Sequence, residues 1–407
     1  MGTQLARNAA EFGDERALIF EGRDINWRGF NELANQYANA LKADSVTAGD
    51  TVCIMMENRI EFLAAMIGVN KLGATTALIN TGLTGTPLIH CISSVESKKV
   101  IAGTECQQAI SEAMEDIPLT AGEDFLVIKN QPGDDIPNWA RDFDQVAGDA
   151  SKDNPPETGE IDANSPGFYI FTSGTTGLPK AAIVSNRRFM GSAVAAGKIG
   201  LRCGRGDTLY LCLPLYHLTG LMLGFGGGLT VGATMFVRRR FSASNFLPEI
   251  RENNCKAMVY IGEMCRYLMN SPEKPDDADN PLQNIMGNGL RPDIWMDFKQ
   301  RFGIERIAEF YGSSEGNVAF LNLLNKDKTI GFCSMPYAVV KYDIDNDEIV
   351  RDANGRCIKA EEGEAGLLMG EITERTKSEG YTSQEATEKK IVRNALRMVT
   401  PGSTRVT

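Results

Sequence analysis

The chain has 407 residues, 43% hydrophobic and 23% charged, a composition typical of a globular protein with two or three domains. Its net charge of −11 argues against a nucleic-acid partner and against a polybasic membrane anchor, because both need clustered lysine and arginine. Nine cysteines without a C-x-x-C pair argue against a disulfide framework or structural zinc. The N-terminus lacks the apolar segment of a signal peptide, so we expect a cytoplasmic protein with at most peripheral membrane association.

The first part of the chain alternates between helical and strand patterns. Residues 28–43 predict a helix through apolar residues at helical spacing, namely Phe30, Leu33, Tyr37 and Leu41. Residues 51–56 and 75–80 predict strands, and residues 61–72 predict a helix that ends at Gly73. This alternation predicts an α/β fold with parallel sheets covered by helices. We place the first α/β domain at residues 1–165, where a polar connection over about residues 131–163 forms its last part.

The most informative stretch is residues 171–180, which read FTSGTTGLPK. Glycines let the backbone approach a ligand closely, successive N–H groups can cradle an anion, and Lys180 adds a positive charge. The stretch is not a Walker A loop, because Pro179 precedes the lysine and strand patterns flank it at residues 167–171 and 181–184. We interpret it as a phosphate-binding hairpin. The alternative is a plain glycine-rich turn, which would not need four hydroxyl groups and a lysine.

Residues 208–237 carry no charged side chain and invite a membrane interpretation. Within them four glycines repeat at a spacing used by packed membrane helices, namely Gly220, Gly224, Gly228 and Gly232. Pro214, His217 and the glycine run 226–228 interrupt a helical pattern repeatedly. We therefore favour buried strands at residues 209–213 and 233–237, joined by loops.

The later part of the chain changes character twice. Residues 166–337 continue the α/β alternation and form the predicted second domain with the phosphate hairpin. Residues 338–376 contain short strand patterns around a turn at 352–355, which predicts a small antiparallel β-barrel. Residues 377–407 form a tail.

Four motifs in chain order resemble those of the adenylate-forming enzymes, which include acyl-CoA synthetases, luciferases and peptide-synthetase adenylation domains. The hairpin is the first, and the others are residues 213–220 (LPLYHLTG), 311–317 (YGSSEGN) and 363–368 (GEAGLL). Three further segments are similar to the fatty acid transport protein or very-long-chain acyl-CoA synthetase branch, namely residues 260–268, 287–295 and 301–304. The resemblance runs from about residue 17 to about residue 391. It implies two doubly wound sheets packed with helices, a small distorted β-barrel, and an active site between them.

The resemblance implies that a long- or very-long-chain fatty acid reacts with ATP and Mg²⁺ to give an acyl-adenylate, from which coenzyme A displaces AMP. The carboxylate is already ionised, so the first step needs charge neutralisation and alignment, not a general base. The implied catalytic residues are Lys180, Glu315 and His217. The implied phosphate-binding residues are Thr172, Ser173, Gly174, Thr175, Thr176, Gly177 and Lys180. The implied residues near the adenine and the acyl carboxylate are Gly287, Asn288, Gly289, Tyr311, Gly312, Ser313 and Ser314. Glu315 and Thr176 would hold Mg²⁺, which prefers oxygen ligands.

For several of these residues a structural role is the alternative. Tyr311 has the pattern of a core aromatic at a strand end, and Asn288-Gly289 is also an ordinary turn signal. His217 has the alternative of a core histidine whose hydrogen bonds are satisfied, and Glu315 that of a solvated surface residue. His90 has no motif around it, and we expect a structural role for it.

The resemblance stops before the ribose-binding aspartate, the hinge, a nucleotide-contacting arginine and the mobile C-terminal lid with its catalytic lysine. We therefore expect that the lid domain is absent and that this chain alone adenylates fatty acids poorly or not at all, because the lid excludes water from the site. The alternatives are a catalytically inactive nucleotide- or acyl-binding fragment and a membrane-associated fatty acid uptake component. The sequence leaves the acyl chain length and the oligomeric state open.

Overall fold

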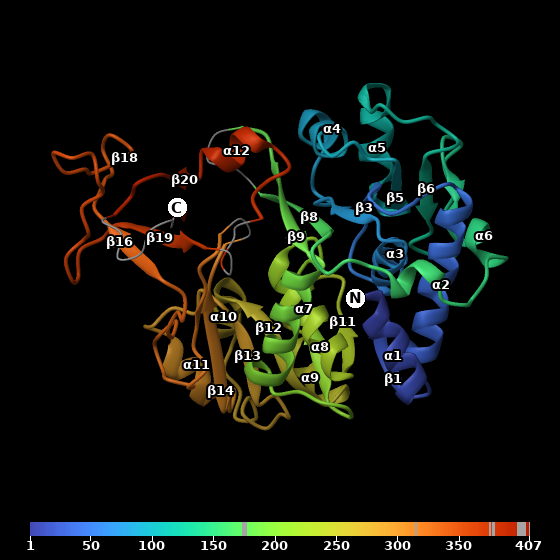
Figure 1. The fold of residues 1–407 in the computed structure, drawn as a ribbon. Coiled ribbons are helices and arrows are strands. Elements are labelled where there is room, and N and C mark those ends of the chain that lie inside the picture. The colour runs from blue at the N-terminus through green and yellow to red at the C-terminus, as the bar shows by residue number, and fades with distance from the viewer. Residues whose placement is uncertain (173–176, 314–315, 374–375, 377–378, 397–403, 407) are drawn as a thin grey trace.

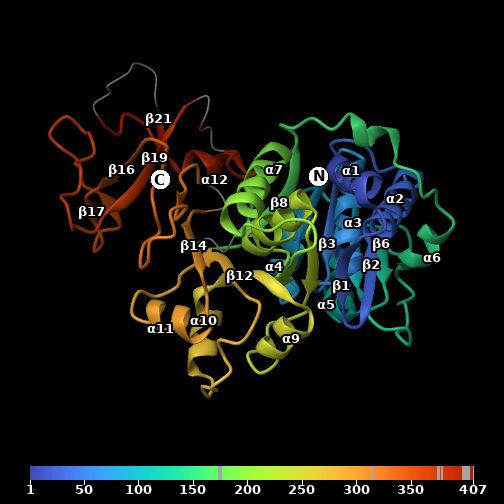
Figure 2. The ribbon, with the colours of Figure 1, turned by 90° about the horizontal axis from the view of Figure 1, so that it is seen from below.

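A computed structural model describes residues 1–172, 177–313, 316–373, 376, 379–396 and 404–406. Two large sheets with packed helices form most of the molecule, and small antiparallel sheets form the rest (Figure 1). The small sheets lie at the opposite end of the molecule from helices α2 (Trp27–Ala43) and α6 (Phe143–Gly148) in both views (Figures 1 and 2). The predicted α/β class is confirmed.

The first large sheet has seven strands in the order β7-β6-β5-β3-β4-β8-β9, parallel except for the antiparallel pair of β8 and β9. Its strands are β3 (Thr51–Met55), β4 (Thr75–Leu78), β5 (Lys99–Gly103), β6 (Phe125–Ile128), β7 (Arg141–Asp142), β8 (Pro166–Thr172) and β9 (Lys180–Ser185). Its helices include α3 (Ile60–Lys71), α4 (Gly85–Ser93) and α5 (Gln107–Ala113). The predicted strands at 51–56 and 75–80 and the helix at 61–72 are confirmed.

The second large sheet has eight strands in the order β15-β14-β13-β12-β10-β11-β1-β2, with a parallel centre and an antiparallel strand at each edge. Its strands are β1 (Arg16–Phe20), β2 (Arg23–Asn26), β10 (Thr208–Leu211), β11 (Thr234–Val237), β12 (Cys255–Ile261), β13 (Asn284–Asn288), β14 (Arg306–Tyr311) and β15 (Phe320–Leu321). Its helices include α1 (Gly2–Phe12), α7 (Asn186–Ala195), α9 (Phe246–Glu252), α10 (Gly262–Asn270) and α11 (Trp295–Arg301).

The strands of the two sheets do not divide at residue 165, where the sequence placed a domain boundary. Strand β1 pairs in parallel with β11, so the N-terminal hairpin belongs to the second sheet. Strand β8 pairs in parallel with β4, so the phosphate hairpin belongs to the first sheet. One buried cluster contains alternate residues of β3, such as Val52 and Ile54, together with Leu209 and Leu211 of β10, so the two sheets share a core.

The uncharged segment 208–237 contains a helix where we expected loops. A π-helical turn, η5 (Thr219–Phe225), continues directly into α8 (Gly226–Val231), and the strands on either side are confirmed as β10 and β11. The glycines permit this helix to pack closely on α7: a Cβ atom on Gly226 would lie 2.9 Å from the Cβ of Ala193. Close packing thus outweighs the low helix propensity of glycine. Among the described residues, no helix combines the length and the apolar character needed to cross a membrane.

Two other segments differ in secondary structure from the prediction. The polar connection at 131–163 includes β7 and α6, and Phe143 of α6 stacks on Tyr37 of α2 with ring centroids 4.6 Å apart. The predicted barrel at 338–376 contains a two-stranded ribbon of β17 and β18 and contributes to a four-stranded antiparallel sheet, β16-β19-β21-β20. The other two strands of that sheet, β20 and β21, come from the predicted tail at 377–407. These strands are β16 (Tyr337–Val340), β17 (Tyr342–Asp343), β18 (Glu348–Ile349), β19 (Leu367–Ile372), β20 (Ile391–Val392) and β21 (Thr404–Val406).

Candidate functional site

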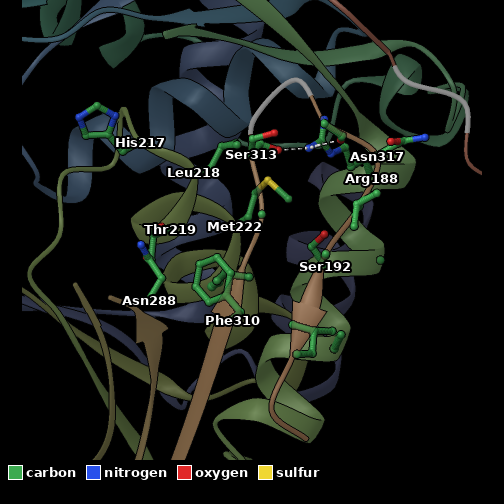
Figure 3. Close-up of a pocket in the computed structure, with 18 of the residues that line it drawn as sticks. Arg188, Ser192, His217, Leu218, Thr219, Met222, Asn288, Phe310, Ser313 and Asn317 are labelled. Carbon is green, nitrogen blue, oxygen red and sulfur yellow. Dashed lines mark hydrogen bonds between the residues drawn. The ribbon is translucent and has the colours of Figure 1, made fainter. Parts of the chain in front are cut away.

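A cavity of about 1310 Å³ opens at the carboxyl ends of β12, β13 and β14. Ile261 and Asn288 line it from the ends of β12 and β13, and Gly312 and Ser313 line it directly after β14. The opposite wall comes from α7 and from η5 (Figure 3). In α/β sheets this edge of parallel strands is the usual place for a ligand, so the fold and the cavity indicate the same site.

The cavity has an apolar part and a polar part. The apolar part is lined by Met222, Leu223, Met286, Phe310, Leu321 and Leu323. Polar groups gather where the strands end, including Arg188, Ser313 and Asn317 (Figure 3). Such a cavity suits a ligand with a charged head and a hydrocarbon body.

The predicted phosphate hairpin is a pair of antiparallel strands, as expected. Thr172 of β8 stands opposite Lys180 of β9, and the Thr172 hydroxyl donates to the Lys180 carbonyl over 3.4 Å. A strand, not a helix, follows the lysine, which agrees with the rejection of a Walker A loop. Gly177 has φ = +126°, a conformation that only glycine adopts readily. The predicted contacts Ser173, Gly174, Thr175 and Thr176 lie outside the described residues.

A late segment of the chain holds the hairpin from its outer edge. The amide of Ile183 donates to the carbonyl of Gly380, and the amide of Thr382 donates to the carbonyl of Ala181, both over 3.0 Å. The Lys180 ammonium lies 5.9 Å from the ring centroid of Tyr381, within cation–π range. Residues 379–382 therefore extend the sheet beyond β9 and contact the predicted phosphate lysine.

The carboxylate of Glu379, at the start of that segment, also lines the cavity. It accepts hydrogen bonds from the amide of Ser185, over 2.8 Å, and from the Ser185 hydroxyl. Our reading of the sequence missed both Glu379 and Tyr381. Their only local signal is Gly380-Tyr381-Thr382, which carries no indication of the strand that it joins.

His90 also contacts the hairpin, although no sequence motif surrounds it. Its Nε2 donates to the carbonyl of Pro179 over 3.0 Å, which fixes the hydrogen on that nitrogen. His90 lies on α4, so a helix of the first sheet contacts the hairpin directly before Lys180.

Arg188 connects the helix after the hairpin with the predicted metal-binding motif. Its guanidinium donates to the carbonyl of Ser313 over 3.1 Å and to that of Gly316 over 3.5 Å (Figure 3). Ser185 caps the start of α7 by accepting from the Arg188 amide over 3.1 Å, so the end of β9 sets the position of this arginine. The structure thus places the flanks of two motifs beside each other, although 125 residues separate Arg188 from Ser313.

The predicted metal ligand Glu315 and its neighbour Ser314 lie outside the described residues, as does Thr176. Among the residues that the structure does describe, no group of three or more His, Cys, Asp or Glu side chains is placed to hold a metal ion. A carboxylate and a hydroxyl remain a suitable oxygen donor set for Mg²⁺.

The other predicted residues differ in their relation to the cavity. Asn288 lines it, whereas Gly287 packs beside β12, where a Cβ on it would lie 2.1 Å from the carbonyl oxygen of Tyr260, and Gly289 packs against Gly262 at the start of α10. Tyr311 is 51% exposed and meets Phe320 edge-on, at 6.3 Å between centroids, so it is not a core aromatic. His217 lies at one edge of the cavity, apart from Ser313 in Figure 3, and partial desolvation lowers its pKa.

The family model of AMP-binding enzymes matches residues 5–369. The chain belongs to this family. A medium/long-chain-fatty-acid–CoA ligase of Mycobacterium tuberculosis, FadD6, is 40% identical over 397 residues, which are 98% of this chain and 64% of the relative. Long-chain fatty acid transport protein 2 of Rattus norvegicus is 36% identical over 93% of this chain and 62% of its own length. The chain thus spans somewhat less than two thirds of these curated relatives.

Solved structures show the same fold for this member of the AMP-binding family. The inhibitor-bound N-terminal domain of FACL13 from Mycobacterium tuberculosis superposes with a TM-score of 0.75 at 20% identity, over 99% of this chain and 94% of that domain. That similarity confirms the predicted architecture of an N-terminal core.

Proposed function

We propose that this chain is the adenylation core of a fatty acid–CoA ligase, which activates a long- or very-long-chain fatty acid with ATP for transfer to coenzyme A. The observation that carries the proposal is the meeting, at one cavity, of hairpin strand β9, which lines it through Ile183 and Ser185, and the strand edge bearing Asn288 and Ser313. Lys180 begins the same strand, three residues before Ile183, and is not itself among the residues that line the cavity. The apolar part of the same cavity suits a hydrocarbon chain. The 40% identical relative is a medium/long-chain-fatty-acid–CoA ligase, which supports a fatty acyl substrate.

The proposed chemistry needs positive charge and backbone donors at the triphosphate. Lys180, Thr172 and Gly177 would bind the β- and γ-phosphates together with the hairpin residues 173–176. Tyr311 would stack on adenine with its exposed ring, and Asn288 and His217 would border the acyl carboxylate. Glu315 and Thr176 would hold Mg²⁺, which neutralises phosphate charge when it is bound.

Calorimetry with a non-hydrolysable ATP analogue and Mg²⁺, and then with an acyl-adenylate analogue, tests the proposed site. We expect binding by the wild-type chain and a loss of roughly 100-fold or more in the double variant Lys180→Ala, Glu315→Ala. Lys274→Ala is a matched control, because Lys274 is an exposed lysine in a surface loop outside the cavity. Equal affinity of the wild type and the double variant would refute the assignment.

Pyrophosphate release with ATP, Mg²⁺ and oleate separates catalysis from binding. Binding of both analogues without pyrophosphate release would favour a nucleotide- and acyl-binding module over a ligase core. Co-sedimentation with liposomes tests the uptake alternative, for which the net charge of −11 predicts weak binding to anionic vesicles.

A further inference from the structure

Glu309 is a buried carboxylate directly behind the predicted nucleotide-binding edge. It lies on β14, two residues before Tyr311, and the residue is 3% exposed. One carboxylate oxygen accepts from the amide of Gly289 and, over 3.2 Å, from the amide of Leu290. The other oxygen accepts from the hydroxyl of Tyr260. Both oxygens are therefore engaged: two donors come from the residues directly after the neighbouring strand β13, and the third comes from β12, one strand further along the sheet.

In the described part of the chain, all of the groups that donate hydrogen bonds to Glu309 are neutral. Burial raises the pKa of Glu309, while the hydrogen bonds from Tyr260, Gly289 and Leu290 oppose that rise, and no cation contributes among the described residues. A buried carboxylate without an ion pair is costly, and an apolar side chain would fill the same space without that cost. The carboxylate is therefore present for what it contacts rather than for packing.

What it contacts is the segment Gly287–Leu290, which turns away from the sheet after β13. Gly289 has φ = +83°, and a Cβ on Gly262 would lie only 1.7 Å from the Gly289 carbonyl oxygen. The segment is thus pressed against the start of α10 on one side. The amides of Gly289 and Leu290 lie beyond the strand ladder, and the Glu309 carboxylate is their acceptor.

Asn288 lies inside this segment and faces the cavity near Phe310 (Figure 3). A shift of the Gly289 amide would move Asn288 directly, because the two residues are adjacent in the backbone. Misplacement of a substrate-contacting group by about 1 Å can lower a rate about 100-fold.

We propose that Glu309 is a positioning residue, whose carboxylate, oriented by the Tyr260 hydroxyl, fixes the Gly287–Leu290 segment so that Asn288 is aligned on the ligand. The consequence of this role, the alignment of Asn288 on the ligand, rests on the proposed adenylation function. The fixing of the segment itself is a property of the chain alone and can be measured without any ligand.

Three variants separate alignment from stability. Glu309→Leu keeps the volume but leaves two buried amides without an acceptor, and we expect at least a 30-fold loss in acyl-adenylate analogue affinity. Glu309→Gln keeps an acceptor oxygen for the amides and a donor for the Tyr260 oxygen, so we expect it to recover most of that loss. Tyr260→Phe removes only the second anchor, and we expect a loss of a few fold.

Tyr37→Phe is the matched control, because the Tyr37 hydroxyl also donates to a carboxylate, Asp144, over 2.6 Å, but outside the cavity. We expect it to lower the unfolding midpoint and leave analogue affinity unchanged. If the wild-type chain catalyses the reaction, Glu309→Leu should lower kcat more than it raises KM. Unchanged affinity in folded Glu309→Leu, or no recovery in Glu309→Gln, would overturn the proposal.

Amide hydrogen exchange of Gly289 and Leu290, without ligand, keeps the two proposals distinguishable. We expect exchange of both amides to accelerate in Tyr260→Phe and Glu309→Leu relative to amides of β12. If Glu309→Leu does not fold, Tyr260→Phe decides: unchanged exchange overturns the positioning role. If the wild type binds no analogue, the proposed function fails, while accelerated exchange still supports the fixing of the segment.

Discussion

The two sides of the cavity are held in place in different ways. On the strand side, Glu309 holds Gly287–Leu290 from within the core. On the hairpin side, residues 379–382 form backbone hydrogen bonds with β9, and His90 donates a hydrogen bond to the carbonyl of Pro179. The strand side therefore forms together with its sheet, whereas the hairpin side needs a distant part of the chain to dock. We expect the hairpin side to open more easily, because local stability follows burial and contact density.

Of the substitutions that test this comparison, removal of the arginine that joins the two sides should have the largest effect. In Arg188→Ala, the carbonyls of Ser313 and Gly316 lose a charged donor, and we expect a loss of about 30-fold in affinity for an ATP analogue. Arg188→Lys keeps the charge but not the planar fork and should fall between that variant and the wild type. Wild-type affinity in Arg188→Ala would show that the two sides align independently.

Lys71, a buried lysine outside the cavity, provides a reference substitution that should change stability and leave ligand affinity unchanged. Lys71 is 0% exposed, and its ammonium donates to the side-chain oxygens of Asn31, Asn35 and Asn154 over 2.6–2.7 Å. Burial lowers its pKa from 10.5 to about 7. Between about pH 7 and 10.5 the unfolded chain therefore binds a proton that the folded chain has released, so stability contributed by Lys71 rises with pH.

The expected slope from Lys71 is about 1.4 kcal/mol per pH unit in that window, since one pKa unit corresponds to that energy. Urea unfolding of the wild type and of Lys71→Met at pH 7.5, 8.5 and 9.5 gives the slope as a difference between the two proteins. The subtraction removes other titrating groups, such as buried cysteines. Analogue affinity should be unchanged in Lys71→Met. Equal slopes in both proteins would mean that the ammonium stays charged in the fold.

The sequence predicts the strand side better than the hairpin side, for a physical reason. The ends of β13 and β14 lie within motifs that carry the family resemblance, with residues such as Asn288 and Gly312, so the sequence alone already assigns them to the ligand site. The same is true of the hairpin strands themselves. The contact of Tyr381 with Lys180 instead depends on pairing between segments about two hundred residues apart, and no local pattern specifies such a partner.

Two other features that the sequence does not predict also depend on contacts between distant elements. The helix at Thr219–Val231 forms because its glycines fit against α7, and the sequence of the segment alone predicts breaks. Glu309 has no local signal of its role, since its donors lie on two other strands or their loops. The fold class follows from periodicity, whereas contacts between elements follow from packing.

Substitution of Tyr381 tests the hairpin side from outside. Tyr381→Leu removes the ring beside the Lys180 ammonium, and we expect a loss of 5- to 10-fold in ATP-analogue affinity. Tyr381→Phe keeps the ring and should stay within about twofold of the wild type if the ring is what positions the lysine. A loss in Tyr381→Phe as large as in Tyr381→Leu would assign the effect to the hydroxyl.

The smallest effect is expected at His90, whose imidazole donates one hydrogen bond to the hairpin, at the carbonyl of Pro179, in the part of the chain that the structure describes. His90→Phe keeps an aromatic ring but removes the donor, and a bond of this kind contributes about 1 kcal/mol, so we expect a loss of about threefold to fivefold in analogue affinity. His90→Gln places an amide donor near the same position and should recover part of it. Equal affinities in His90→Phe and His90→Gln would indicate that His90 supports the hairpin by packing alone. The hydrogen bonds that fix the outer edge of the hairpin would then be those of residues 379–382.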